Sequence, residues 1–210
     1  MIKPRWCPKL FVLTICLAAL VSAPASAQRG WVRDGGWVAA QVGYGWASWS
    51  CLTCGPARAQ GSWTGGYSAG GTVNPHLLIG GEFNIWGLST PVRSVGKIAD
   101  HMCGLAAEVL VYPHASGPFF VKAGAGISAV GDDSAGTLGV GPAFVAGLGL
   151  DSQLSWRVSV TPVVTMYSGS LGTLRDPRSR ASRAYLWNQR IVAFGLAITA
   201  QDRRPGWKKV

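Results

Sequence analysis

The chain has few charged residues: they make up 13% of its 210 residues, and only nine of them are acidic. A soluble β-sandwich would need one charged face on its strands to meet water, and this composition does not supply it. Beyond residue 27 the sequence also lacks a long, continuous apolar run that could form a membrane-spanning helix. Glycine, with 29 residues, and tryptophan, with ten, are abundant instead. These features point away from an ordinary soluble domain and from a helical membrane protein.

Cysteines are also few. Of the five, two lie in the first 27 residues, which leaves Cys51, Cys54 and Cys103. A metal site would want more ligands at matching spacing, and a thioredoxin-like redox motif would need a βαβ context that is absent. An oxidising compartment permits disulfides, so we expect a local disulfide between Cys51 and Cys54. No metal or other cofactor is predicted.

The first 27 residues have the organisation of a secretory signal peptide. Three basic residues precede a short apolar run at 10–21, and Ala-Ser-Ala at 25–27 fits the small-x-small cleavage rule, so the mature chain is expected to begin at Gln28. A lipoprotein signal acylated at Cys16 is the alternative, but Ile15 stands where a small residue is required. After cleavage 16 basic residues face nine acidic ones, a net charge of +7. An exported basic chain is better suited to anionic lipid or polysaccharide than to nucleic acid.

Residues 118–150 alternate with a period of two, which is typical of β-strands. From Phe119 to Ile127 every second residue is apolar, while those between are mainly glycine, serine and Lys122. After a turn cluster at 130–136 the alternation resumes as far as Leu150. Large residues on one face and small ones on the other suit a small closed barrel, whose interior is crowded and whose outer face meets lipid.

Eight alternating segments can be marked along the chain. They span 37–46, 62–73, 76–87, 100–112, 119–128, 138–150, 156–167 and 187–201. Their connections alternate between short ones, at 74–75, 113–117 and 151–155, and long ones, at 47–61, 88–99 and 168–186. Outer-membrane barrels have such short periplasmic turns and longer outer loops. The expected fold is all-β, an eight-stranded antiparallel up-and-down transmembrane β-barrel with both chain ends in the periplasm.

Aromatic residues and prolines add two expectations. Aromatic residues cluster near predicted strand ends and suggest two interfacial girdles. The outer girdle would contain Trp46, Trp49, Trp63, Trp86, Tyr167 and Trp187, and the inner one Tyr112, Phe119 and Trp156. Pro142 and Pro162 lie inside strands, where each removes a ladder hydrogen bond, so we expect bulges or local bends there.

The signal peptide, the eight strands and the alternating connections together resemble the small eight-stranded outer-membrane barrels of the OmpA/OmpX type. The resemblance covers residues 35–201. It implies a monomeric, non-enzymatic protein of a Gram-negative-type outer membrane, inserted by the outer-membrane assembly machinery. Such barrels usually end at an aromatic residue of the last strand, whereas this chain continues. We therefore divide it into a signal peptide (1–27), a barrel domain (28–202) and a basic periplasmic tail (203–210).

Because successive residues of a strand face opposite sides, even and odd positions can be assigned to the lumen or to lipid; we call this assignment strand parity. It places four charged side chains inside this barrel: Glu82, Glu108, Lys122 and Arg157. An isolated charge in a narrow interior is too costly, so these two acids and two bases are expected to pair. Lys122 and Glu108 lie on adjacent strands and are expected to be in closest contact. Because eight strands leave an interior that side chains just fill, a salt-bridged plug is expected, with a gate or narrow ion path as the alternative.

The last predicted outer loop is rich in arginine and contains one acid; its arginines are Arg175, Arg178, Arg180 and Arg183. Guanidinium groups suit phosphate, sulfate and carboxylate, so the loop is a candidate contact for lipopolysaccharide or an anionic host glycan. We therefore expect a structural or surface-binding outer-membrane protein.

Three other functions are kept as alternatives: a lipid A-modifying enzyme on the same scaffold, a narrow porin, and a soluble periplasmic barrel that binds an apolar ligand. His114 and Ser116 are similar to the His-x-Ser pair of outer-membrane lipid A deacylases, but Gly117 follows and no acid is found to orient the histidine. The sequence names no specific ligand.

Overall fold

The computed structural model of the chain describes residues 31–52, 59–87, 101–132, 136–175 and 182–205. These residues contain no helix that is long and apolar enough to cross a membrane. The predicted signal peptide and its cleavage site lie outside the described residues, and so do Cys54, Arg178 and Arg180.

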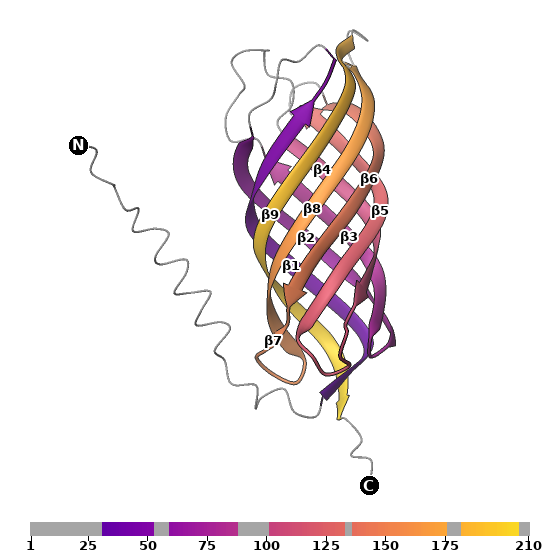
Figure 1. The fold of residues 1–210 in the computed structure, drawn as a ribbon, viewed down its shortest axis with the longest axis vertical. Coiled ribbons are helices and arrows are strands. Elements are labelled where there is room, and N and C mark those ends of the chain that lie inside the picture. The colour runs from indigo at the N-terminus through magenta and orange to yellow at the C-terminus, as the bar shows by residue number, and fades with distance from the viewer. Residues whose placement is uncertain (1–30, 53–58, 88–100, 133–135, 176–181, 206–210) are drawn as a thin grey trace, which may run out of the picture.

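Eight long strands form one antiparallel sheet that closes into a barrel (Figure 1). They are β1 (Trp31–Ser50), β2 (Gln60–Asn74), β3 (Leu77–Gly87), β4 (His101–Val111), β5 (Phe119–Asp132), β6 (Gly136–Leu150), β8 (Val158–Arg175) and β9 (Ser182–Pro205). Strands adjacent in sequence pair with each other, β6 pairs with β8, and β1 with β9 completes the closure. A two-residue strand, β7 (Ser152–Gln153), pairs with the start of β8. The predicted eight-stranded up-and-down barrel is confirmed.

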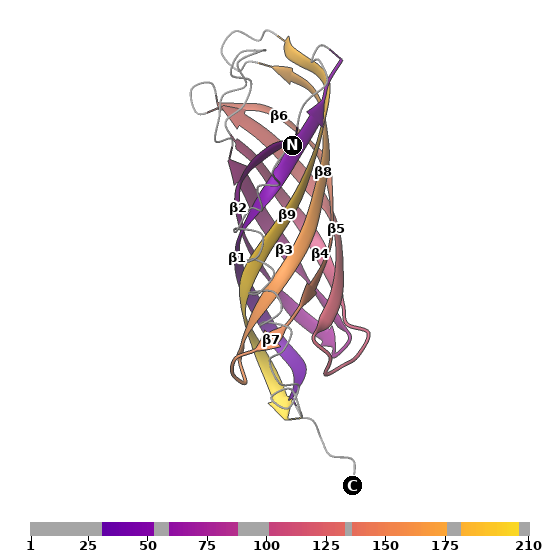
Figure 2. The same cartoon turned by 60° about the vertical axis from the view of Figure 1, so that its left-hand side comes forward.

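Both ends of the described chain lie at the same end of the barrel (Figures 1 and 2). Trp31 at the start of β1 pairs with Pro205 near the end of β9. This end, which we call the terminal end, also carries β7 and the short turn between β2 and β3. The opposite end, the loop end, is where β1, β3, β5 and β8 finish. Short connections thus gather at the end that holds the chain termini, as the alternation of connection lengths predicts.

Side chains alternate between the lumen and the outer surface along the strands. Phe83 and Val121, predicted to face lipid, are 41% and 47% exposed, whereas their neighbours Glu82 and Lys122 are 1% and 6% exposed. Large exposed apolar residues occur on all eight long strands. The strands therefore carry the outward-facing apolar band of a transmembrane barrel.

Glycines on the lumen face let neighbouring strands approach closely. At Gly126 a Cβ would meet the carbonyl oxygen of Leu105 on β4, and at Gly43 it would meet that of Phe194 on β9. Such contacts involve backbone atoms, so rotation of a side chain cannot relieve them, and a residue without Cβ is required. The tight curvature of a barrel only eight strands wide accounts for this crowding.

Of the bulges or local bends expected at the two strand prolines, no bulge is found, and each proline lies where a ladder ends. The ladder between β6 and β8 runs from Ala143–Gly169 to Gly149–Val163, so Pro142 and Pro162 each lie one residue beyond one of its ends. On its other side Pro142 pairs with β5 and Pro162 pairs with β9, and neither of these ladders shows a register shift at the proline. Since proline lacks an N–H, pairing on one side stops there without displacing the strand.

β8 and β9 are longer than the sequence predicts. The connection expected at 168–186 shortens to 176–181, because residues on both sides of it continue the two strands. Their polar, glycine-containing composition indicated a loop, but a ladder needs only backbone hydrogen bonds, and this one continues through three register shifts. Gly172, at φ 67°, lies at two of these irregularities. Arg175 and Arg183 therefore belong to strands.

Candidate functional site

Three charged side chains meet inside the lumen; we call Glu82, Glu108 and Lys122 the lumen ion cluster. Lys122 Nζ lies 2.6 Å from Glu82 Oε2 and 3.7 Å from Glu108 Oε2. Glu82 Oε1 also accepts hydrogen bonds from the Tyr167 hydroxyl at 2.6 Å and from the Gln41 amide at 3.0 Å. All three charged residues are at most 6% exposed. Lys122 therefore links side chains of β3, β4 and β5, and Glu82 is the carboxylate with the most partners.

The closest partner of Lys122 differs from the expected one. Sequence spacing favoured Glu108 on the adjacent strand, yet the ammonium group reaches Glu82, which lies one strand further away. A Cβ at Gly147 would lie 3.1 Å from Lys122 Cε, so this glycine leaves space for the lysine stem. In a narrow lumen a long side chain can extend across the interior, so its closest partner need not lie on an adjacent strand.

Arg157 was predicted to join this cluster, and that prediction was wrong. It lies at the terminal end, just before β8 begins, and its side chain is 58% exposed. Its Nε lies 3.8 Å from Asp202 Oδ1, and its guanidinium stacks 4.0 Å from the centroid of the Trp156 ring. The parity rule holds only within a strand, and Arg157 precedes the strand that would have turned it inward.

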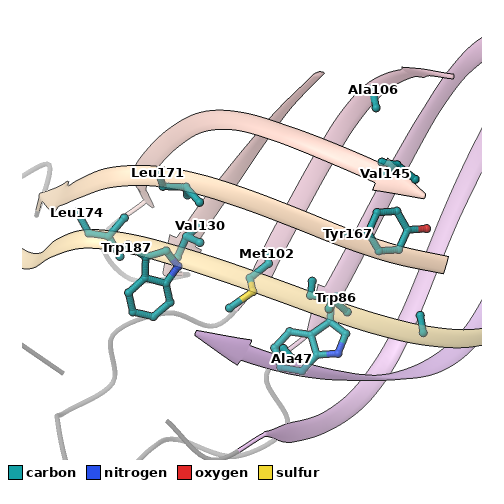
Figure 3. Packing of buried hydrophobic residues seen from close by; sticks show 12 residues of the cluster. Ala47, Trp86, Met102, Ala106, Val130, Val145, Tyr167, Leu171, Leu174 and Trp187 are labelled. Carbon is teal, nitrogen blue, oxygen red and sulfur yellow. The ribbon is translucent and has the colours of Figure 1, made fainter. Parts of the chain in front are cut away.

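Towards the loop end the lumen is filled by a continuous apolar cluster (Figure 3). Its larger members are Trp86, Met102, Val130, Tyr167, Leu171, Leu174, Trp187 and Ile191. Trp86 and Trp187 are 1% and 2% exposed. Their indole groups donate hydrogen bonds to Gly45 O and Gln189 Oε1. Small or polar residues are usual inside such barrels, so this part of the lumen resembles the packed core of a soluble domain.

This cluster corrects the predicted aromatic girdles. Trp86, Tyr167 and Trp187 face the lumen, and Trp49 stacks on Trp187 with ring centroids 5.9 Å apart. Tyr112, assigned to the inner girdle, is only 3% exposed. Position near a strand end does not decide which face a side chain takes. The period-two rule does, and it gives Trp86 the same inward direction as Glu82.

The terminal end of the lumen holds a second buried polar group, the mouth cluster, made of Arg33, Tyr112, Asp151 and Thr161. Arg33 Nη2 lies 3.3 Å from Asp151 Oδ2, and the same carboxylate accepts hydrogen bonds from the Tyr112 and Thr161 hydroxyls at 2.8 and 2.7 Å. The Arg33 guanidinium also donates to the carbonyls of Ala115 and Gly117 and lies 3.4 Å from the Tyr112 ring centroid. Burial and the nearby Asp151 raise the pKa of the Tyr112 hydroxyl, so it remains a donor. Arg33 thus links the start of β1 to the connection between β4 and β5 and to Asp151, which follows β6.

Sequence reasoning missed the mouth cluster. Arg33 lies before the segment marked as the first strand, and a register shift between Arg33 and Trp37, with Gly35 at φ 64°, separates it from that segment. In the sequence, Asp151 lies in the predicted short connection at 151–155 and is interpreted only as a turn residue. The only available signal is that these charges flank strand ends, which does not identify a pair 118 positions apart.

A smaller apolar cluster (Trp37, Leu78, Leu110, Tyr112 and Phe120) lies in the same part of the lumen as the mouth cluster. A cavity of about 40 Å³ is lined by Glu108, Lys122, Asp151 and Thr161 among others, and one of about 20 Å³ lies between β4, β5, β6 and β8. Volumes of this order hold water molecules. Neither is large enough for a sugar or an acyl chain.

Of the remaining predicted site residues, Cys51 and Arg175 lie near the loop end. Cys51 is partly buried against the apolar cluster, and its predicted disulfide partner Cys54 lies outside the described residues, so the disulfide stays a prediction. Cys103 is a free cysteine on β4. Arg175 is exposed at the end of β8, whereas the side chain of Arg183 is not among those described.

In the part of the chain that is described, neither the predicted His-x-Ser pair nor the metal-ligating residue types are assembled into a site. His114 and Ser116 are both exposed in the connection between β4 and β5. Among the described residues, no hydrogen bond joins the two side chains. Within the same ranges, no group of three or more His, Cys, Asp and Glu residues could hold a metal ion.

The closed, outwardly apolar, eight-stranded barrel defines the class: the chain has the fold of the small outer-membrane β-barrels. Among solved structures it is similar to Neisserial surface protein A, with a TM-score of 0.56 and 11% identity over 82% of this chain and 99% of that chain. It is also similar to Ail of Yersinia pestis (TM-score 0.46, 11% identity, 79% and 99% covered) and to OprG of Pseudomonas aeruginosa (0.45, 9%, 81% and 98%). At these identities the likeness concerns the fold. No known protein family and no curated protein matches the sequence.

Proposed function

We propose that the protein is a non-enzymatic barrel of a bacterial-type outer membrane, with a plugged lumen and a structural or surface-binding role. It reaches that membrane through the signal peptide at 1–27 and the outer-membrane assembly machinery, and it acts as a monomer. The terminal end faces the periplasm and the loop end faces outward. The Cys51–Cys54 disulfide braces the first outer loop.

The observation that carries this proposal is the packing of the lumen along its length. The apolar cluster at the loop end, the lumen ion cluster and the mouth cluster all lie inside one narrow barrel. The cavities of about 20 and 40 Å³ that the barrel residues line are on the scale of water molecules. This arrangement supports a barrel that holds its strands together and presents its loops, and it argues against a porin.

Conductance in planar lipid bilayers tests the plug. The refolded protein should show no stepwise conductance of the size found for open porins. A Trp86→Ala, Trp187→Ala variant is the matched control, because it removes the two largest side chains of the loop-end cluster and should conduct more than the natural protein. A large conductance of the natural protein would contradict the plug and move the function to a porin.

Surface binding is supported by an exposed arginine at the loop end and by the basic sequence that follows it. Arg175 is exposed there, and Arg178, Arg180 and Arg183 follow in the chain. We propose that they contact lipopolysaccharide phosphates or an anionic host glycan. An epitope inserted after Arg180 should be labelled on intact cells, whereas one inserted after Ser152 should not. Labelling of the second alone would reverse the assignment of the two ends.

A lipid A-modifying enzyme remains the alternative function. It would need a base and an orienting group next to a nucleophile, and it predicts a change of mass in lipid A. Mass spectrometry of lipid A from cells with and without the protein separates the two proposals. An identical lipid A profile is expected, and a loss or gain of one acyl chain would overturn the non-enzymatic assignment.

A further inference from the structure

An arginine outside the predicted basic loop stands at the boundary between the apolar and polar parts of the outer surface. Arg190 on β9 is exposed. On the same outward face of this strand, Phe194, Leu196 and Ile198 continue towards the terminal end at 47–61% exposed. Directly across from Arg190 lie Ser48 on β1 and Ser168 on β8. The outward face therefore changes from apolar to polar at this level.

Immediately on the terminal side of Arg190 the outer surface carries four aromatic residues in contact: Tyr44, Trp46, Trp63 and Phe194. Their rings meet edge to face, with centroids 5.4 Å apart for Tyr44–Trp46, 5.9 Å for Tyr44–Trp63 and 6.0 Å for Trp46–Phe194. They are 39–69% exposed and belong to β1, β2 and β9. The outward positions described for β3, β4, β5, β6 and β8 hold no tryptophan or tyrosine, so the cluster occupies one side of the barrel only.

The spacing sets the level of Arg190 relative to these rings. Trp46 pairs with Val192, two residues from Arg190. Two residues of an antiparallel strand cover about 7 Å, and a tilt of about 40° reduces the rise along the barrel axis to about 5 Å. Tryptophan and tyrosine favour the membrane interface, so the guanidinium lies where lipid headgroups begin. Within the described residues Arg190 has no acidic partner, whereas Arg157 at the opposite end already pairs with Asp202 and stacks on Trp156.

We propose that Arg190 and the aromatic cluster bind one molecule of a phosphorylated outer-leaflet lipid of the lipid A type. The guanidinium takes the phosphate through paired, charge-assisted hydrogen bonds, and the Tyr44, Trp46, Trp63 and Phe194 rings lie against the first part of the acyl chains. This inference rests on the proposed outer-membrane location. It assigns a lipid site on the barrel wall, separate from the arginines of the last loop.

The test titrates the folded protein in detergent with bisphosphorylated lipid A and with the same lipid after removal of both phosphates, and counts bound lipid by native mass spectrometry. The natural protein should prefer the phosphorylated lipid. Arg190→Gln should weaken that binding about tenfold, which corresponds to about 1.4 kcal/mol, while Arg190→Lys retains part of it. Arg157→Gln is the matched control for loss of one exposed arginine and should bind as the natural protein does. Trp46→Ala should weaken binding of both lipids.

Equal binding by Arg190→Gln and the natural protein, or equal binding of both lipids by the natural protein, would overturn the inference. Displacement of the lipid by millimolar inorganic phosphate would do so as well, because it would indicate a free-phosphate site. The mobility shift on heating that folded barrels show in gels checks that each variant is folded. Fractionation separates the two levels of failure: absence from the outer membrane rejects the proposed function, whereas an outer-membrane protein insensitive to Arg190→Gln rejects only the lipid site.

Discussion

Replacing Lys122 by methionine is the most direct test of how the lumen is held together. Methionine keeps the length and apolar character of the lysine stem but removes the ammonium group, which lies 2.6 Å from Glu82 and 3.7 Å from Glu108. Both carboxylates are at most 3% exposed. After the substitution neither has a cationic partner among the residues that the structure describes, although Glu82 keeps its hydrogen bonds from Tyr167 and Gln41.

The expected loss of stability is large because burial leaves little solvent to compensate. Breaking a buried pair by removing one partner typically costs about 3–5 kcal/mol. The Lys122→Met, Glu82→Gln double variant removes both charges and lets Tyr167 and Gln41 bond to a neutral amide. It should therefore lose less stability than the sum of the two single variants, by about 1–3 kcal/mol. Coupling of Lys122 with Glu108 should be smaller, since that distance is 1.1 Å longer.

Urea unfolding of the barrel from lipid vesicles, followed by tryptophan fluorescence, measures these free energies. Arg157→Met is the matched control, because the ion pair between the 58% exposed Arg157 and the 64% exposed Asp202 should contribute less than about 1 kcal/mol. Effects of Lys122→Met and Glu82→Gln that add within about 0.5 kcal/mol would show that the two charges do not interact. A Lys122→Met variant as stable as the natural protein would refute the reasoning entirely.

Three further predictions concern other parts of the barrel. Arg33→Met should destabilise it by about 3 kcal/mol in the same assay, because Asp151 stays buried and loses the guanidinium while it keeps its hydroxyl donors; an effect below 1 kcal/mol would mean that the mouth cluster contributes little. Gly147→Ala should cost about 1–3 kcal/mol, since its Cβ would lie 2.7 Å from a carbonyl oxygen of β8, whereas Gly71→Ala, with nothing within 4 Å, should be close to neutral. Alkylation of the denatured, unreduced protein should modify one cysteine per mature chain, and labelling of Cys51 and Cys54 as well would exclude their disulfide.

The eight-stranded fold could be predicted from the sequence, because the residues of a barrel strand alternate between two different environments. Alternation between large apolar and small or polar side chains marked all eight long strands, and the lengths of the connections indicated which ends lie together. The same parity placed Glu82, Glu108 and Lys122 inside and Phe83 and Val121 outside. These properties are local, since each depends only on which face of its own strand a residue occupies.

Parity within a strand carries no information about what lies across the lumen. The contact of Lys122 with Glu82 depends on the stagger of three strands and on the space left by Gly147. The Arg33–Asp151 pair joins positions far apart in the sequence, and Arg33 lies beyond a register shift in β1.

The loop-end cluster and the exact limits of the strands follow the same rule. Parity could have turned Trp86 inward, but only the closed barrel brings it together with Met102 and Trp187 in one packed core. Arg157 shows the converse: it has inward parity, yet the strand begins one residue later, so it lies in water. Which face a residue takes is a local property of the chain, whereas partners across the lumen and the points where strands begin depend on closure of the whole sheet, and only the tertiary structure decides them.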